Sequence, residues 1–207
     1  MIYLEDDYLE KYISVFSYIF ERSAFEKYSL SYVQNKIAYS VIANELERSN
    51  ITTVAFSSKE KIYTDLFPDF EVNDFKSSLY NIYGWLGYLY VHLFLDLKLT
   101  WEMLFIILPL KRAMEMYPLY HEMDYKQSLD YVKSLQKYSN LDCILTIKKI
   151  STLSLAKSTS IPEATLKAIR YNHRDISKLS VSSVSKIALH LGVKIESLLP
   201  SLNLECA

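Results

Sequence analysis

The sequence predicts an all-α protein made of two helical domains, and three observations support this. Only 3 Gly and 5 Pro occur among 207 residues, fewer than a β-rich or loop-rich fold needs for its turns. Half of the residues are hydrophobic and 14% are aromatic, which is enough to bury a core. Along most of the chain, apolar residues recur at the three- and four-residue spacing of amphipathic helices.

The first 138 residues predict a helical domain. Helical patterns cover residues 4–20, 30–46, 59–66, 77–97, 101–108 and 125–138. Thr100 and Asp124 are suited to cap the last two, and a further short helical turn is expected to end at Tyr117-Pro118. The β-branched stretch ITTVAF at 51–56 predicts a short strand or an extended linker.

The segment at 77–97 is apolar on nearly every side, which predicts burial at the centre of a helical bundle. Gly84 and Gly87 lie within it, where small residues allow close helix packing. The tyrosines along this segment are expected to pack between helices. Alternatively, part of this aromatic surface, with Trp85 and Trp101, lines a pocket or a partner groove.

From Ser139-Asn140 onwards the pattern changes to short helices with tight turns. We expect helices over 141–149, 152–158, 161–170, 181–191 and 195–199. Ser151 is suited to cap the second helix, and Pro162 fits the first turn of the third. Asn172 can adopt a left-handed conformation, and Gly192 is a typical helix terminator. Ala156 would allow the second and third helices to cross closely. The small core would contain Leu155, Leu166, Ile169, Val184, Ile187 and Leu191.

Residues 140–200 resemble the phage-repressor family of helix-turn-helix domains, the Cro-like or xenobiotic-response-element type. The resemblance is carried by LAKST, IP-x-x-TL, a loop before the fourth helix, and IALHLGV-x-IESLL. Ser160 and Asn172 stand where the family commonly has glycine, and both residue types suit turns. The resemblance implies a five-helix, lambda-repressor-like domain that binds double-stranded DNA.

The resemblance also implies which residues contact DNA. The third helix would read base edges in the major groove with Glu163, Ala164, Thr165, Lys167 and Ala168. Glu163 can accept from a cytosine amino group, Ala164 can touch a thymine methyl, and Lys167 can reach guanine. Phosphate contacts would come from Thr152, Asn172, His173 and Arg174.

The charge distribution is compatible with this division. Residues 140–207 carry nine Lys or Arg and five Asp or Glu, whereas residues 1–139 carry fourteen and nineteen. A basic segment joined to an acidic one suggests one face for nucleic acid and another for a different partner. However, the third helix has no Arg, Asn or Gln before Arg170, so the small domain could instead be a protein-contact module.

The expected function is a sequence-specific transcriptional repressor or autorepressor, forming a homodimer on a palindrome. Residues 1–138 would then sense a ligand, bind a partner protein or mediate dimerisation. Two alternatives remain open. One is an antitoxin that also represses its operon. The other is a mobile-element inhibitor, such as an anti-CRISPR protein with an autoregulatory DNA-binding domain.

Other classes of function have no motif to support them. We expect no enzyme activity, metal or cofactor, because His92, Asp96 and His121 accompany no HExxH, CxxC or nucleophile signature. His92 is interpreted as a core histidine. Cys143 and Cys206 follow no metal or redox spacing. The acidic start of the chain is unlike a signal peptide, and no apolar stretch is uncharged enough to span a membrane. We therefore expect a cytoplasmic protein.

Overall fold

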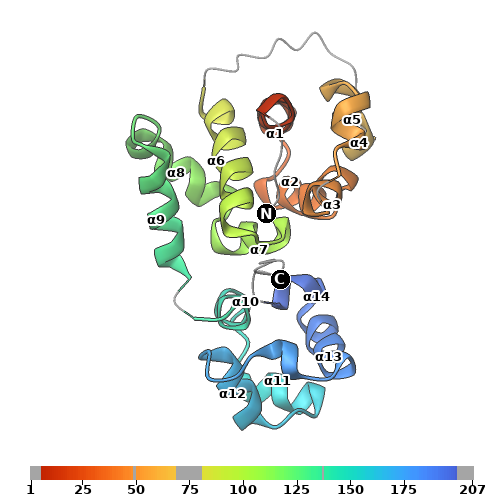
Figure 1. Cartoon of the computed structure of the whole chain (residues 1–207), viewed down its shortest axis with the longest axis vertical. Helices are drawn as coiled ribbons and strands as arrows, with labels where there is room; N and C mark the ends of the chain where they lie inside the picture. Colours follow the sequence, from red (N-terminus) through yellow and green to blue (C-terminus); the bar gives the residue numbers. More distant parts are fainter. Residues whose placement is uncertain (1–5, 49, 69–80, 137, 200–207) are drawn as a thin grey trace. The chain divides into compact units, whose positions relative to one another are not determined.

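The computed structural model describes residues 6–48, 50–68, 81–136 and 138–199, and no β-strand occurs among them. The prediction of an all-α fold is confirmed for these residues. The chain divides into two compact units (Figure 1), here called unit 1 and unit 2, with the division between Leu129 and Asp130. This division falls within α9 (Tyr125–Leu135), earlier than the boundary expected at Ser139-Asn140.

The described residues of unit 1 form eight α-helices and the start of α9. They are α1 (Asp6–Phe25), α2 (Leu30–Ala38), α3 (Val41–Glu47), α4 (Thr52–Phe56), α5 (Lys59–Leu66), α6 (Ile82–Leu97), α7 (Trp101–Ile107) and α8 (Leu110–Tyr120). As the sequence predicts, Thr100 caps α7 by accepting from the Met103 N–H. Asp124 accepts from the Lys126 N–H at the start of α9. These side chains satisfy backbone donors that a helix start leaves unpaired.

Helix α1 lies at the centre of unit 1, with α6 alongside it and α4 and α5 on its other side (Figure 1). The approach of α1 to α6 depends on Gly87. A Cβ at that position would lie 2.6 Å from the Ser17 backbone N and 2.8 Å from the Ile13 carbonyl oxygen. The role predicted for Gly87 is therefore confirmed, and the neighbouring Gly84 carbonyl accepts a hydrogen bond from Ser17.

The core of unit 1 is organised around the indole of Trp101. Its ring stacks against Phe16 of α1 at a centroid distance of 4.2 Å and against Phe94 of α6 at 5.5 Å. All three side chains are buried. Tyr90, also fully buried, donates its hydroxyl to the Leu108 carbonyl oxygen at 2.6 Å. The apolar sequence of α6 is thus explained by burial between neighbouring helices, as predicted.

Residues 51–56 were expected to form a strand or linker, and this prediction is wrong because residues 52–56 form α4. Local hydrogen bonds favour the helix. The Asn50 side chain accepts from the Thr52 N–H, and the Glu45 carboxylate accepts from the Thr53 N–H. Val54 is buried. These interactions outweigh the β preference of the Thr and Val side chains, which is only a weak determinant.

Several predicted helix bounds also differ from the structure. Helix α1 continues to Phe25 instead of ending at residue 20. The single helix expected over 30–46 is divided into α2 and α3, because the chain turns at Tyr39 and Ser40 and the Ser40 side chain caps α3 by accepting from the Ala43 N–H.

Helix α8 continues past Tyr117-Pro118 to Tyr120. Because Pro118 lies in the last turn, little of the helical hydrogen-bond ladder is lost. Helix α9 ends at Leu135 rather than at 138, and α6 begins at Ile82. The expected start of this helix, at residues 77–80, lies outside the described residues.

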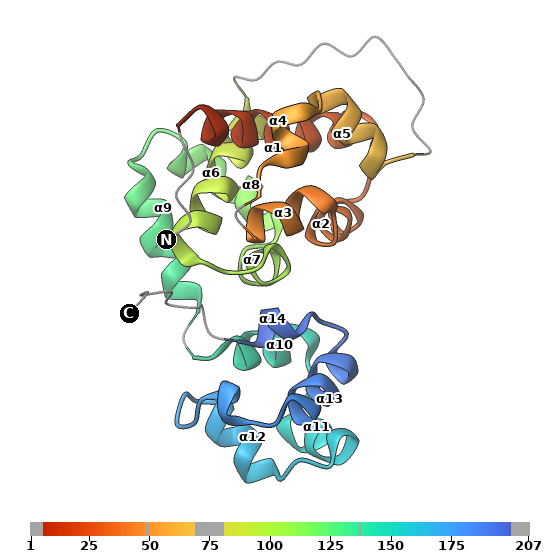
Figure 2. The same cartoon turned by 45° about the vertical axis from the view of Figure 1, so that its right-hand side comes forward.

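Unit 2 contains five α-helices and one 3₁₀ turn in its described part, after the end of α9 (Figure 2). They are α10 (Asn140–Lys148), α11 (Thr152–Thr159), α12 (Glu163–Arg170), η1 (Ile176–Lys178), α13 (Val181–Leu191) and α14 (Ile195–Leu198). The bounds lie within two residues of those expected. All six residues predicted for the small core are buried. Ser151 caps α11, and Asn172 and Gly192 adopt the left-handed conformation, as predicted.

None of the helices in these described ranges is long and apolar enough to cross a membrane. The same ranges contain no group of three or more His, Cys, Asp or Glu side chains placed to hold a metal ion. Cys143 is a free, half-buried thiol, and burial raises its pKa to about 11. Cys206 lies outside the described residues.

His92 of α6 is half-buried in an aromatic cluster rather than in the core. Its ring centroid lies 4.3 Å from that of Tyr88 and 5.2 Å from that of Tyr125. The Tyr125 hydroxyl donates to the Asp96 carboxylate at 2.7 Å. Burial lowers the pKa of His92, although the nearby Asp96 and Glu10 carboxylates act in the opposite direction.

We predict that Gly87→Ala destabilises unit 1 by about 1–3 kcal/mol, because the added methyl meets backbone atoms of α1 that cannot move independently. The free energy of unfolding, measured by urea denaturation, checks this. Adding Ser17→Ala should not restore stability, because the Ser17 N and the Ile13 carbonyl oxygen remain. A stabilising Gly87→Ala, expected from helix propensity alone, would contradict the close approach.

We also predict that His92 destabilises unit 1 at mildly acidic pH. Its pKa is lower in the folded state than its ordinary value of 6.5, so the unfolded chain binds the proton more readily. The contribution of neutral His92 is therefore present above about pH 6.5 and lost as the pH falls through the lowered pKa. The stability difference between wild type and His92→Gln should shrink from pH 7.5 to pH 5. A stability difference that grows on acidification would contradict the lowered pKa of His92.

Candidate nucleic-acid interface

Helices α11 and α12 are joined by a three-residue turn, Ser160, Ile161 and Pro162. Ser160 ends α11 in the left-handed conformation, with φ 58°. Ile161 is buried, and Pro162 stands just before the first residue of α12 rather than within its first turn. Helix α11 contacts both α12 and α13 (Figure 2). The turn therefore redirects the chain sharply while α11 stays anchored in the core of the unit.

Helix α12 has one buried and one outward side. Leu166 and Ile169 are buried in the core of unit 2. The five predicted base-reading residues lie on the remaining surface, here called the outer face of α12: Glu163, Ala164, Thr165, Lys167 and Ala168. Ala164 and Lys167 are exposed, and the other three are half-exposed. Because most of these side chains are short, another molecule can approach the helix backbone closely.

The charged residues of the outer face pair with each other. The Lys167 ammonium lies 2.9 Å from the Glu163 carboxylate, one helical turn away. The hydrogen bond and charge of Glu163 raise the pKa of Lys167. Such an exposed pair contributes little to stability. It nevertheless cancels the net charge of the outer face, so any phosphate or base that Lys167 contacts must compete with Glu163.

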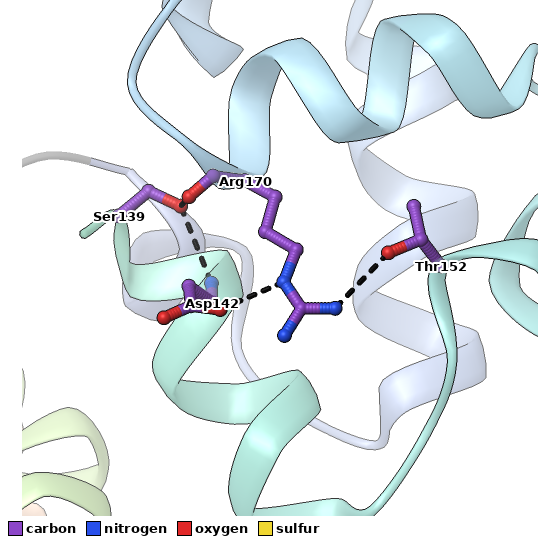
Figure 3. A network of polar contacts seen from close by, with 4 residues as sticks. All are labelled: Ser139, Asp142, Thr152 and Arg170. Carbon is purple, nitrogen blue, oxygen red and sulfur yellow. Dashed lines mark hydrogen bonds and ion pairs between the residues drawn. The ribbon is translucent and has the colours of Figure 1, made fainter. Parts of the chain in front are cut away.

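Arg170, at the end of α12, is held inside unit 2 by a polar network (Figure 3), here called the Arg170 network. Its Nε donates to Asp142 of α10 at 2.7 Å, and its Nη1 donates to the Thr152 hydroxyl of α11 at 3.2 Å. Its carbonyl oxygen accepts from the Ser139 hydroxyl at 2.9 Å. The only arginine of α12 therefore joins three helices, and no local sequence pattern indicates this structural role.

Thr152 was predicted to contact phosphate, and the structure assigns its side chain a different place. The residue is 5% exposed, and its hydroxyl accepts from Arg170. Its polar group is thus used within the unit. Sequence reasoning missed this because the position of Thr152 at a helix start is equally suited to both roles.

The loop after α12, residues 171–175, presents the other predicted phosphate contacts. The Ala168 carbonyl oxygen accepts from the N–H groups of His173 and Arg174, at 2.8 and 3.1 Å. Asn172 has φ 61° and donates its N–H to the Ile169 carbonyl oxygen. The side chains of residues 172–174 are all exposed. The backbone of this loop is thus fixed to the end of α12 while three polar side chains point to solvent.

Unit 2 carries other exposed cations that the sequence analysis did not single out. They are Lys148, Lys149, Lys157, Lys178 and Lys186. A charge count alone could not separate them from Arg170, because it does not distinguish exposed cations from those used in internal ion pairs.

No family model, no curated protein and no solved structure matches this chain. The role of unit 2 must therefore follow from its own residues.

We predict that Arg170→Ala destabilises unit 2 by about 1.5–3 kcal/mol, because it removes charge-assisted hydrogen bonds and leaves the Asp142 carboxylate without its partner. Thermal or urea unfolding of the full chain, followed by amide signals of residues 140–198, measures this. Lys167→Ala is the matched control on the same helix. Because the ion pair between Lys167 and Glu163 is exposed, its loss should change the free energy of unfolding little. Equal effects of the two substitutions would contradict the structural role of Arg170.

Proposed function

We propose that this chain is a sequence-specific DNA-binding transcriptional regulator, a repressor or autorepressor, that binds double-stranded DNA through unit 2. The observation that carries the proposal is the outer face of α12, which follows α11 across a three-residue turn and presents short side chains to solvent. A major groove admits an α-helix. A helix with such side chains can lie deep in the groove. The resemblance of residues 140–200 to phage-repressor domains supports the same use.

Phosphate contacts are proposed for the loop at 171–175. Its backbone is held to α12 by the Ala168 carbonyl, which places Asn172, His173 and Arg174 beside the end of the recognition helix. Side chains at such a position can clamp the DNA backbone and set the orientation of the helix in the groove. Arg174 supplies the fixed positive charge of this set.

Base recognition is proposed to depend on the outer face of α12. Ala164 and Thr165 offer methyl groups for thymine, and Lys167 can reach guanine after separating from Glu163. Freed from that pair, the Glu163 carboxylate can accept from a cytosine amino group. With only two charged readers, one helix gives modest specificity. A homodimer on a palindrome would supply the rest.

Unit 1 is proposed to serve regulation, by sensing a ligand, by binding a partner protein or by mediating dimerisation. Its aromatic core is built around Trp101 and depends on the close approach at Gly87. These features give it a core of its own. A cytoplasmic location is part of the same proposal.

Selection of binding sites from random double-stranded DNA with the full-length protein tests the proposal. We expect a palindrome to be enriched. Lys167→Ala should relax the preference at one position of each half-site, whereas Arg174→Ala should weaken binding on all sequences and lower the salt slope by about one. Lys61→Ala, which removes an exposed cation of unit 1, is the matched control. It should change neither the base preference nor the strength of DNA binding. Failure to enrich any sequence at low salt would refute DNA binding by this unit.

Substitution of Glu163 distinguishes two effects of this residue on DNA binding, namely recognition of a base and repulsion of the phosphate backbone. We predict that Glu163→Gln tightens binding to non-specific DNA several-fold, because Lys167 loses its competing partner and a negative charge near phosphate is removed. If Glu163 reads cytosine, the same change should lower the preference for that base in the selected site. Fluorescence anisotropy with selected and scrambled duplexes measures both. Weaker binding to both duplexes would contradict the proposed placement of the outer face.

A further inference from the structure

A cavity of about 350 Å³ in unit 2 opens to solvent and is lined in part by the loop at 171–175. Its apolar lining includes three buried side chains, Ile169, Ile176 and Leu198, together with Tyr138. Arg174 and Asp175 line the same cavity and are exposed to solvent. The cavity therefore combines an apolar floor with one guanidinium and one carboxylate at its solvent side. Its volume is within the range of small-molecule sites, roughly 300–1,000 Å³.

Two uncharged polar side chains of the wall, Asn140 and Ser139, already form hydrogen bonds within the unit. The Asn140 amide donates to the Leu199 carbonyl oxygen at 2.7 Å, and its Oδ1 accepts from Gln136 at 2.6 Å. The Ser139 hydroxyl donates to the Arg170 carbonyl oxygen. These bonds make the wall rigid. A ligand would consequently gain its polar contacts mainly from the two charged groups.

The two charges at the solvent side have different surroundings. The Asp175 carboxylate accepts from the Ser177 N–H at 2.8 Å, and hydrogen bonding to Ser177 lowers the pKa of Asp175. It is thus ionised at neutral pH. Within the described residues, Arg174 forms no ion pair. Its guanidinium can therefore bind a ligand carboxylate through two parallel hydrogen bonds.

We propose that this cavity binds a free α-amino acid with an apolar side chain. The ligand carboxylate would contact Arg174, its ammonium would contact Asp175, and its side chain would cover the floor of Ile169, Ile176 and Leu198. A simple anion would be repelled by Asp175, and a simple cation would be repelled by Arg174. A zwitterion satisfies both groups, and an apolar side chain is suited to the apolar floor.

The regulatory consequence rests on the proposed function. Arg174 is also the proposed phosphate contact, and a guanidinium that holds the ligand carboxylate is lost to the DNA backbone. Bound amino acid would therefore weaken DNA binding several-fold and act as an inducer.

Ligand binding is tested without DNA, by titrating ¹⁵N-labelled full-length protein with L-leucine, L-isoleucine and L-phenylalanine at millimolar concentrations. We expect saturable shifts of amides at 136–140 and 169–176. Two leucine analogues separate the charges: 4-methylpentanoate lacks the ammonium, and L-leucinamide lacks the carboxylate. Both should bind at least ten-fold more weakly than leucine.

Three variants test the residues. Arg174→Ala should abolish leucine binding. Asp175→Asn should weaken leucine binding but improve that of 4-methylpentanoate, and asparagine still caps η1, so the loop keeps its fold. Lys186→Ala, which removes an exposed cation of α13 outside the cavity, should leave binding unchanged.

The proposal is overturned if none of the three amino acids produces saturable shifts, or if Arg174→Ala binds leucine as well as wild type. Amide spectra of each variant confirm that unit 2 remains folded. Because this titration needs no DNA, a chain that binds leucine but no duplex would refute the proposed function and leave the amino-acid site standing. DNA binding unaffected by a bound amino acid would refute only the regulatory coupling.

Discussion

The geometry of unit 2 depends on the hydrogen bonds of Arg170. This side chain reaches Asp142 on α10 and Thr152 on α11 from the last residue of α12 (Figure 3). Its carbonyl accepts from Ser139, at the start of α10. One residue thus fixes the end of the proposed recognition helix against two neighbouring helices. Together with the burial of Leu166 and Ile169, this constraint orients the outer face of α12, while the Ala168 carbonyl holds the following loop.

Unit 1 depends on a constraint of a different kind. Its helices α1 and α6 approach so closely that only glycine fits at position 87, and this brings Phe16 and Phe94 against Trp101. Such packing depends on shape more than on directional polar contacts. The aromatic cluster at His92 lies outside this core and is where we predict a response to mild acid, because the proton must enter a partly buried site.

Most helices could be predicted from the sequence, because apolar periodicity and capping side chains are local signals. The six-residue core of unit 2 and the left-handed Asn172 and Gly192 followed from the same signals. Helix α4 could not be predicted, because the carboxylate of Glu45 that stabilises its start comes from another helix.

For the candidate site, the family resemblance implied which residues of α12 face outwards, and the structure leaves them exposed or half-exposed while Leu166 and Ile169 are buried. The sequence did not indicate that Thr152 and Arg170 bond to each other, because residues 18 positions apart meet only through the fold. Likewise, nothing in the sequence pattern pointed to the cavity that Arg174 lines, which is formed by residues from several separate elements.

The central claim is that the outer face of α12 lies in the DNA groove. Photo-crosslinking tests it most directly, with p-benzoylphenylalanine introduced in place of Ala164 or, on α13, in place of Leu189, which is 85% exposed. Each protein is irradiated with a selected duplex or with DNA upstream of its own coding sequence. The account predicts a covalent DNA adduct from position 164 that unlabelled specific DNA competes away, and none from position 189. Adducts from position 189 alone, or no adduct from position 164, would contradict it.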